Sequence, residues 1–271
     1  MGIRYVSIQI RMGNWKEYNW IYLLSCEAIV RYLILSDIHG NLPAFEAVLA
    51  DAGEFDKVWC LGDVIGYGPQ PNECIARLRQ FAHICVAGNH DWAAINKLDV
   101  SSFNPEARHA CLWTREQLTP EHWDYVESLS EKLVEGEFTL VHGSPRYPIW
   151  EYISHPSVAA ANLPFYDTPY CLFGHTHVPA AYSASGDKGK IEAFVMPPGE
   201  TFPLPDPRWL INPGGVGQPR DGDPRASYLI YDSQVDTLQH RRVEYSIEET
   251  QRLMAARRLP DRLAARLLFG W

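Results

Sequence analysis

The sequence predicts an α/β protein in which two β-sheets pack together with helices on the outside. Three observations favour this fold class. The 271-residue chain has an ordinary globular composition, with 46% hydrophobic and 21% charged residues. In its first half, apolar runs typical of buried strands alternate with amphipathic helical stretches. In its second half, strand-like runs follow one another across turns rich in glycine, proline and aspartate. We interpret residues 30–271 as one domain that ends in a helical tail.

The first half begins with Val30–Leu35, a continuous apolar run of the buried-strand type. Asn41 can cap the helix that follows, and Gly53 can end it. A second helix is predicted from Asn72, with apolar residues on one face. The other strands predicted here are Lys57–Leu61, His83–Ala87, Phe138–Val141 and Tyr170–Phe173, and the other helices are Pro105–Leu118 and Pro120–Leu133.

The second half is predicted to be mostly strand. The proline-rich stretch Met196–Pro207 is expected to be a loop, because strand-like sequence resumes on both sides. Residues 246–271 are expected to be helical, since Ser246 and Glu249 fit a capping box and Pro260 then breaks or kinks the helix. The predicted strands are Ile191–Met196, Trp209–Ile211, Ser227–Tyr231 and Thr237–Tyr245.

Residues 1–29 differ from the rest of the chain. The apolar run Trp20–Leu24 is soon interrupted by Glu27 and falls short of the ~20 apolar residues that a membrane-spanning helix needs. A signal peptide would need a longer apolar stretch, although nearby Arg4 and Arg11 keep that alternative open. We interpret residues 1–29 as an N-terminal extension that is either not native or disordered.

The net charge and the cysteines limit the expected binding partners and the expected cellular compartment. Lysine and arginine number 24 and aspartate and glutamate 33, so the formal charge is −9. A chain this acidic is a poor binder of duplex nucleic acid or of anionic membranes, and we expect neither partner. The six cysteines contain no C-x-x-C pair, which excludes a zinc ribbon, and their scatter predicts a reducing, cytoplasmic compartment.

Five of the predicted strands run directly into clusters of polar residues able to bind metals. Binding sites in open α/β sheets form beyond the carboxyl ends of the strands, so five such clusters are expected to converge. One His-x-His or Gly-Asp pair would be weak evidence for a metal site, but five such clusters in one chain are strong evidence. They are Ser36-Asp37-Ile38-His39, Gly62-Asp63, Gly88-Asn89-His90-Asp91, His142-Gly143 and Gly174-His175-Thr176-His177.

The candidate ligands comprise two carboxylates, four imidazoles and one amide. This mixture of oxygen and nitrogen favours borderline divalent ions (manganese, iron, zinc, nickel or cobalt) over calcium, which prefers oxygen alone. Seven ligands are too many for one tetrahedral zinc and suit two ions ~3.5–4 Å apart that share a carboxylate. The set is Asp37, His39, Asp63, Asn89, His142, His175 and His177.

Together these blocks resemble the calcineurin-like metallophosphoesterase superfamily. The resemblance implies a metallo-dependent phosphatase fold, a four-layer αββα sandwich of two packed mixed sheets flanked by helices. It also implies a binuclear metal centre in which Asp63 bridges the two ions. The first ion would be held by Asp37, His39 and His177, and the second by Asn89, His142 and His175.

The same resemblance implies roles for His90 and Asp91. A hydroxide bridging the two metals would be the nucleophile near neutral pH. His90 would donate a hydrogen bond or a proton to the substrate and leaving group, as a general acid. Asp91 would orient His90 and raise its pKa.

Departures from the family's protein phosphatases narrow the expected substrate. Those enzymes carry Asp-Arg-Gly after the second motif, whereas here Asp63 is followed by Val64 and Ile65, with no arginine to clamp a phosphomonoester. The chain looks more like the small bacterial and archaeal phosphodiesterase-type branch, which shares the stretch from Asn212 to Arg220. Further substrate contacts are predicted, with less support, at Tyr67, Arg146, Arg220 and Arg225, where loop packing or pairing with Asp221 or Asp223 is the simpler alternative.

The leading functional hypothesis is a metal-dependent phosphodiesterase that acts on a small phosphoester or nucleotide. Alternatives are a dinucleoside-polyphosphate or nucleotide hydrolase, a phosphomonoesterase, and a non-catalytic scaffold of the same fold. The scaffold is disfavoured because every metal ligand and His90 are present. The sequence leaves the oligomeric state open.

Overall fold

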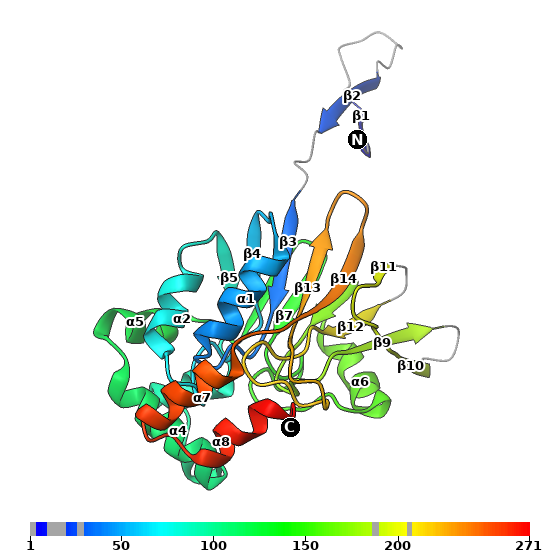
Figure 1. Ribbon diagram of the computed structural model, residues 1–271. Coiled ribbons are helices and arrows are strands. Elements are labelled where there is room, and N and C mark those ends of the chain that lie inside the picture. The colour runs from blue at the N-terminus through cyan, green and yellow to red at the C-terminus, as the bar shows by residue number, and fades with distance from the viewer. Residues whose placement is uncertain (1–3, 10–19, 26–29, 186–189, 205–207) are drawn as a thin grey trace.

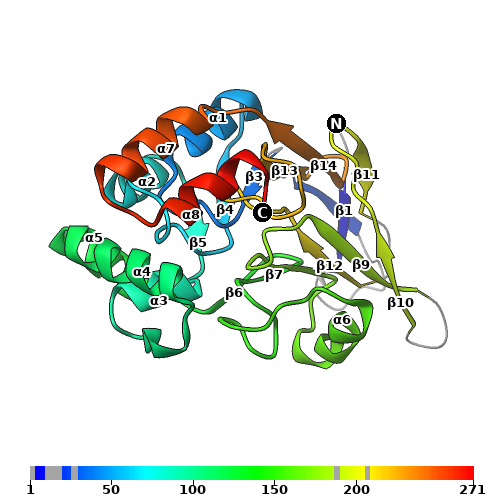
Figure 2. The same cartoon turned by 60° about the horizontal axis from the view of Figure 1, so that its bottom comes forward.

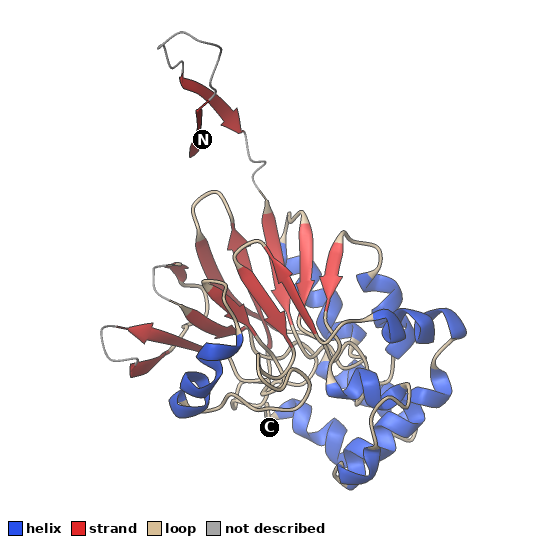
Figure 3. Ribbon diagram, turned by 180° about the vertical axis from the view of Figure 1, so that it is seen from behind, coloured by secondary structure: helices blue, strands red, loops and turns tan. Residues whose placement is uncertain are grey.

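Two six-stranded β-sheets lie face to face at the centre of the protein, as the computed structural model shows (Figure 1). The structure describes residues 4–9, 20–25, 30–185, 190–204 and 208–271. Strands form the two inner layers and helices flank them (Figure 3). This arrangement confirms the predicted αββα fold class.

The first sheet is mixed, with strand order β11-β14-β13-β3-β4-β5. Its strands β3, β4 and β5 run parallel, while β13 pairs antiparallel with β3. Side chains alternate along β3, so that Leu33 and Leu35 face the helices and Ile34 faces the other sheet. The strands are β3 (Arg31–Leu35), β4 (Lys57–Cys60), β5 (His83–Cys85), β11 (Thr201–Pro203), β13 (Ala226–Asp232) and β14 (Thr237–Val243).

The second sheet is also mixed, with strand order β10-β9-β12-β8-β7-β6. Here β12, β8 and β7 run parallel, and the outer strands are antiparallel to their neighbours. Trp59 of the first sheet and Phe138 of the second pack together between the layers, with ring centroids 4.9 Å apart. The strands are β6 (Lys132–Glu135), β7 (Phe138–Val141), β8 (Tyr170–Leu172), β9 (Ala180–Ser185), β10 (Lys190–Phe194) and β12 (Trp209–Asn212).

Helices cover the outer faces of both sheets. Apolar side chains of α1, α2 and α5 form one core cluster with the first sheet, and α6 packs on the second. The helix predicted after Asn41 forms, and the Asn41 side chain accepts a hydrogen bond from the Ala44 amide. The helices are α1 (Leu42–Ala52), α2 (Pro71–Leu78), α3 (Asn89–Ala94), α4 (Pro105–Gln117), α5 (Pro120–Ser128), α6 (Pro156–Asn162), α7 (Ile247–Ala256) and α8 (Asp261–Ala265), with short 3₁₀ turns at Val100–Ser102, Leu163–Phe165 and Arg266–Leu268.

Two predicted elements were wrong. The helix expected over Pro120–Leu133 ends at Ser128, because the residues beyond it pair with β7 as edge strand β6. The loop expected over Met196–Pro207 contains β11, which pairs with β14 at the sheet edge, where a proline is tolerated. Residues 205–207 of that stretch lie outside the described residues. No element was predicted for β9, α3 or α6.

The C-terminal tail packs back onto the domain. Ser246 caps α7 by accepting a hydrogen bond from the Glu249 amide at 3.4 Å, and the helix breaks before Pro260 as predicted. Leu263 and Leu267 are buried in a cluster with residues of α4 and with Tyr67. The tail therefore reaches the loops that follow the strands of the first sheet.

The N-terminal strands and the cysteines complete the fold. β1 (Arg4–Gln9) and β2 (Trp20–Ser25) pair with each other antiparallel, and the proposal that residues 1–29 are a non-native or disordered extension stays a prediction. No helix among the described residues is long and apolar enough to cross a membrane. Cys26 lies outside the described residues, and the other cysteines are free and buried: Cys60, Cys74, Cys85, Cys111 and Cys171.

Candidate metal centre

The polar clusters meet at one edge of the sandwich. Because β3, β4 and β5 are parallel, the loops after them leave the first sheet at the same edge, which faces the viewer in Figure 2. The loops after β7 and β8 bring their histidines to the same place. All the predicted ligands are buried, with at most 4% of any of them exposed: Asp37, His39, Asp63, Asn89, His142, His175 and His177.

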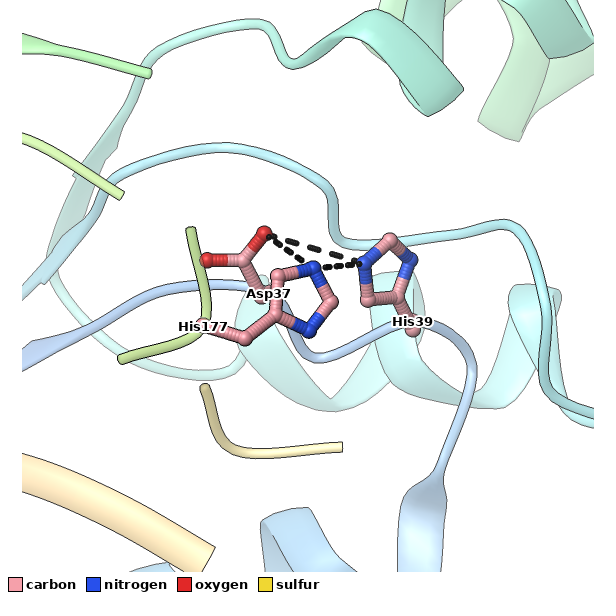
Figure 4. A group of neighbouring side chains, drawn as sticks. All are labelled: Asp37, His39 and His177. Carbon is pink, nitrogen blue, oxygen red and sulfur yellow. Dashed lines mark hydrogen bonds and ion pairs between the residues drawn. The ribbon is translucent and has the colours of Figure 1, made fainter. Parts of the chain in front are cut away.

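Asp37, His39 and His177 form the first ligand group (Figure 4). Nε2 of His177 lies 3.2 Å from Oδ1 of Asp37 and 3.1 Å from Nε2 of His39. The donor atoms of all three side chains thus point toward one another from two separate loops. Such a convergence of imidazole nitrogens and a carboxylate oxygen fits a divalent cation.

Asp63, His142 and His175 form the second group, and Asn89 adjoins it. Nε2 of His142 lies 3.3 Å from Oδ2 of Asp63, 3.0 Å from Nδ1 of His175 and 3.1 Å from Oδ1 of Asn89. The arrangement brings together the four residues that the resemblance assigned to the second ion and to the bridge.

Asp63 lies between the two groups. Its Oδ2 is 3.6 Å from Nε2 of His39 in the first group and 3.3 Å from Nε2 of His142 in the second. That oxygen and Oδ1 of Asp37 are both buried and accept no hydrogen bond from the described residues. Buried carboxylate oxygens without a donor are costly, and a bound cation would satisfy them. The residues therefore fit the two divalent ions that the resemblance implies.

The backbone of this centre is unusual. Asp37, His39, Asp63, His175 and His177 all have left-handed conformations, with φ between 48° and 65°. This region is uncommon for residues other than glycine, and such residues cluster at functional sites, at a cost of about 1–3 kcal/mol each. These costly backbone conformations therefore serve to point the five side chains toward the metal centre.

Backbone carbonyls orient three of the histidines. Nδ1 of His142 lies 2.8 Å from the Leu61 carbonyl oxygen, and Nδ1 of His177 lies 2.5 Å from that of Gln218. His39 makes the same kind of contact with Ile65 at 3.2 Å. In each case a proton on Nδ1 leaves Nε2 as the free ligand atom, a common arrangement around protein-bound metals.

Gly88 allows a close approach to the bridging carboxylate. A Cβ added to Gly88 would lie 2.0 Å from Oδ1 of Asp63, so no other residue fits without displacing that side chain. Oδ1 of Asp63 also accepts a hydrogen bond from the His90 amide at 2.8 Å. Gly88 is thus required because Asp63, in the loop after β4, occupies the space that a side chain at position 88 would fill.

The charges of the centre are strongly coupled. Burial alone would raise the pKa of Asp37, but the neighbouring histidines, His177 first among them, lower it well below its usual range. Burial would lower the pKa of His142, yet Asp63, Asp37 and the Leu61 carbonyl together outweigh burial and raise that pKa to about 10. Burial and then the charge of Arg220 lower the pKa of His177 to about 4. Arg220 is therefore close enough to act on the first ligand group.

The structure corrects the expected role of Asp91. Its Oδ2 accepts hydrogen bonds from the amides of Asp63 (2.8 Å) and Gly88 (2.9 Å), and its Oδ1 accepts one from Ile65 (3.2 Å). Asp91 thus holds the metal-ligand loop and the start of α3, instead of orienting His90. Burial and the charge of Asp63 raise the pKa of Asp91 to about 7.

His90 has different neighbours from those expected. Its Nδ1 lies 3.2 Å from Sγ of Cys111, and its ring packs against Tyr67 with centroids 4.2 Å apart. Burial lowers the pKa of His90 well below its usual value, which favours the neutral ring. The expected rise of this pKa through Asp91 is therefore also corrected. With Nδ1 facing Cys111, Nε2 is the ring nitrogen left for a substrate.

The four predicted substrate contacts separate into two pairs. Arg146 forms an ion pair with Glu151, and Arg225 forms one with Asp223, so both guanidinium groups are paired within their own loops. The pairing of Arg225 with Asp223 is the simpler alternative already noted from the sequence, and substrate contact by either arginine stays a prediction.

Tyr67 and Arg220, in contrast, lie together beside the metal centre. Cζ of Arg220 is 5.6 Å from the Tyr67 ring centroid, and that ring packs against His39 at 4.6 Å. Tyr67 itself has a left-handed backbone, with φ of 54°.

Three further residues at the site were not singled out from the sequence. Gln218 holds His177 through its carbonyl, Cys111 contacts His90, and Arg266 of the C-terminal tail contacts Gln218. Only Gln218 had a sequence signal, since it lies in the stretch that ends at Arg220. Arg266 had none, because packing of the tail alone brings it to this edge.

Comparisons with known proteins agree with this geometry. Residues 30–236 match the calcineurin-like phosphoesterase superfamily domain. An uncharacterized protein of Methanocaldococcus jannaschii, MJ0912, is 36% identical over 244 residues, which cover 88% of this chain and 97% of that protein. The phosphodiesterase YfcE of Escherichia coli K12 is 28% identical over 221 residues, covering 76% of this chain and 90% of its own.

A solved structure gives the same result for the fold. The crystal structure of a metallophosphoesterase from Sphaerobacter thermophilus superposes with a TM-score of 0.83 at 48% identity, covering 90% of this chain and all of the other.

Proposed function

Because the chain belongs to the calcineurin-like phosphoesterase superfamily and is therefore a phosphoester hydrolase, we propose that it cleaves small phosphodiesters at a centre of two divalent metal ions. The observation that carries this proposal is the position of Asp63, whose Oδ2 lies within 3.6 Å of a histidine from each ligand group. One carboxylate between two sets of ligands is the arrangement that a shared, binuclear centre requires.

The ligands divide between the two ions as the groups suggest. Asp37, His39 and His177 would hold one ion, and Asn89, His142 and His175 the other, with Asp63 shared. When bound, the two ions would neutralise phosphate oxygens and supply an acidified water as the nucleophile. Manganese, iron, zinc, nickel and cobalt all suit this donor set, and manganese is our first choice for assays.

His90 and Arg220 act on the substrate in this proposal. The neutral His90 ring donates a hydrogen bond from Nε2 to a phosphoryl oxygen, where charge grows in the transition state. Its further role as proton donor to the leaving group stays a prediction. Arg220 offers a guanidinium beside the first ligand group, and this group suits a phosphate oxygen.

Preference for a diester has two supports. The Escherichia coli relative is named a phosphodiesterase. In addition, the loop after Asp63 continues as Val64, Ile65 and Gly66, without an arginine to clamp a monoester dianion. Nucleotide or dinucleoside-polyphosphate hydrolysis is the second candidate, because Tyr152 stacks on His175 at 3.9 Å and is half exposed, so a base could stack beside the centre.

The test compares the full-length protein with and without metal on bis(p-nitrophenyl) phosphate and on p-nitrophenyl phosphate. We expect turnover of the diester with manganese, its loss on chelation, and slower turnover of the monoester. Asp63→Asn should lower activity at least about 100-fold and lower the bound metal. His109→Ala, which changes an exposed histidine, is the matched control and should behave as wild type.

Failure to hydrolyse any phosphoester with manganese, nickel or cobalt would overturn the proposed function and favour a scaffold. Cytoplasmic location remains part of the proposal, supported by the free state of the five described cysteines.

A further inference from the structure

Gln218 joins the metal centre to two arginines that the proposed mechanism leaves partly unused. Its main-chain carbonyl oxygen lies 2.5 Å from Nδ1 of the ligand His177. Its side-chain Oε1 accepts hydrogen bonds from Arg220 at 2.9 Å and from Arg266 at 3.2 Å. One buried residue thus positions a metal ligand and two guanidinium groups at the same time.

The two guanidinium groups are held close together without a compensating negative charge. Neither forms an ion pair with a carboxylate of the described residues, and their shared partner, Gln218, is neutral. Nε of Arg220 is buried and has no hydrogen-bond acceptor in the described part of the chain. Glu106, whose charge acts on Arg266, forms its ion pair with Arg262. Two like charges in this setting are unfavourable unless an anion joins them.

The tail is fastened so that Arg266 keeps this position. The Gly222 amide donates to the Gly270 carbonyl at 2.9 Å, which ties the end of the chain to the loop that carries Arg220. Leu263 and Leu267, on either side of Arg266, are buried against Tyr67 and α4. In Figures 1 and 2 the C-terminus lies at the edge of the sandwich where β3 and β4 end.

The charges of the metal centre, of Arg220 and Arg266, and of a substrate can be compared. Two divalent ions bring four positive charges, and the carboxylates of Asp37 and Asp63 offset two of them. A metal-bound hydroxide nucleophile would offset a third, so the centre would keep one net positive charge, which the single negative charge of a phosphodiester matches. Arg220 and Arg266 add two more positive charges beside it. A substrate with only one phosphate would leave this excess unmatched.

We propose that Arg220 and Arg266 form a subsite for a second phosphate group, so that the preferred substrates are phosphodiesters that carry an additional phosphate. This inference rests on the proposed function, because it places the scissile phosphate at the metals. Arginine forks bind phosphate oxygens through paired, charge-assisted hydrogen bonds, and of the two forks Nε of Arg220 is without an acceptor among the described residues. The C-terminal tail is then a part of the active site.

The test uses two matched chromogenic substrates with the manganese-loaded, full-length enzyme. Thymidine 5′-(p-nitrophenyl phosphate) has one phosphate, and its 3′-phosphorylated form has two. We expect the 3′-phosphate to lower KM about 10-fold or more in the wild type, since charge-assisted hydrogen bonds are stronger than neutral ones. Arg266→Gln should remove this advantage, so that the two substrates have similar KM values. Arg266→Lys should keep part of it.

Arg262→Gln is the matched control, because Arg262 lies on the same tail segment with an 80% exposed side chain. It should retain the full advantage. The proposal is overturned if the 3′-phosphate gives the wild type no advantage, or if Arg266→Gln weakens both substrates equally.

A binding measurement separates this proposal from the proposed function. Calorimetry should give thymidine 3′,5′-bisphosphate a dissociation constant about 10-fold or more below that of thymidine 5′-monophosphate, and Arg266→Gln should abolish the difference. Binding with this pattern but without turnover would refute the hydrolase function and keep the subsite. Turnover of both substrates, without tighter binding of the bisphosphate, would refute the subsite and keep the proposed function.

Discussion

At the scale of single residues, His90 shows how burial decides a chemical role. Its ring is 4% exposed, packs against Tyr67 and contacts Cys111 through Nδ1. Burial lowers the pKa of this imidazole and favours the neutral ring, and Nε2 is the ring nitrogen that Cys111 does not contact. In the proposed mechanism, hydrogen bonding and proton donation are therefore two separable roles of this residue.

Two substitutions of His90 separate these functions. His90→Asn keeps a hydrogen-bond donor but cannot transfer a proton, whereas His90→Ala removes both. If His90 is the general acid, kcat of both variants should fall about 10²–10⁴-fold on an alkyl phosphodiester, and far less on a p-nitrophenyl diester with its good leaving group. If kcat falls equally on the two substrates, and much less in His90→Asn than in His90→Ala, then His90 acts through hydrogen bonding alone. Metal content should be unchanged in both.

At the scale of elements, the short helix α3 organises the loop that carries Asp63. Asp91 in its first turn satisfies three buried amides, two of them in the neighbouring loop after β4. The Gly88 position before the helix leaves room for the Asp63 carboxylate. This six-residue helix therefore carries Asn89 and His90 beside the second ligand group and supports the loop of Asp63.

Replacing Asp91 by alanine should destabilise the fold more than it alters the acid chemistry. Three buried amides would lose their acceptor, and we expect the free energy of unfolding to fall by about 3 kcal/mol or more. Urea unfolding measures this, with Asp99→Ala as the control, since Asp99 caps an exposed 3₁₀ turn and should matter much less. An unchanged unfolding free energy, combined with an altered pH profile of kcat, would restore the expected role of Asp91 beside His90.

At the scale of the whole molecule, packing two sheets face to face brings five loops to one edge. The first sheet contributes Asp37, Asp63 and Asn89, and the second contributes His142 and His175. Neither sheet alone completes a ligand group, because each group contains a histidine from the second sheet and an aspartate from the first. Metal binding is thus coupled to the docking of the sheets.

Metal removal should therefore lower the stability of the whole domain. Ions that bind the folded state about 100-fold above their dissociation constant add about 2.7 kcal/mol, which corresponds to about 5–10 °C in Tm for a chain of this size. Differential scanning calorimetry with manganese and with chelator measures the shift. Asp63→Asn should show little difference between the two conditions. A wild-type Tm that is independent of metal would contradict this coupling.

The sequence by itself determined the fold class and the metal-binding residue types, and only the tertiary structure decided which side chains touch. Apolar strands that end in Asp, Asn or His predict convergence, because parallel strands share a carboxyl edge. The pairing of Arg225 with Asp223 was an alternative that the sequence left open, whereas the three amides on Asp91 and the contact of Arg266 with Gln218 followed no local pattern. They depend on side-chain packing between segments remote in sequence, or on competition between nearby partners. Hydrophobic periodicity and secondary-structure propensity describe one segment at a time, so they do not encode such contacts.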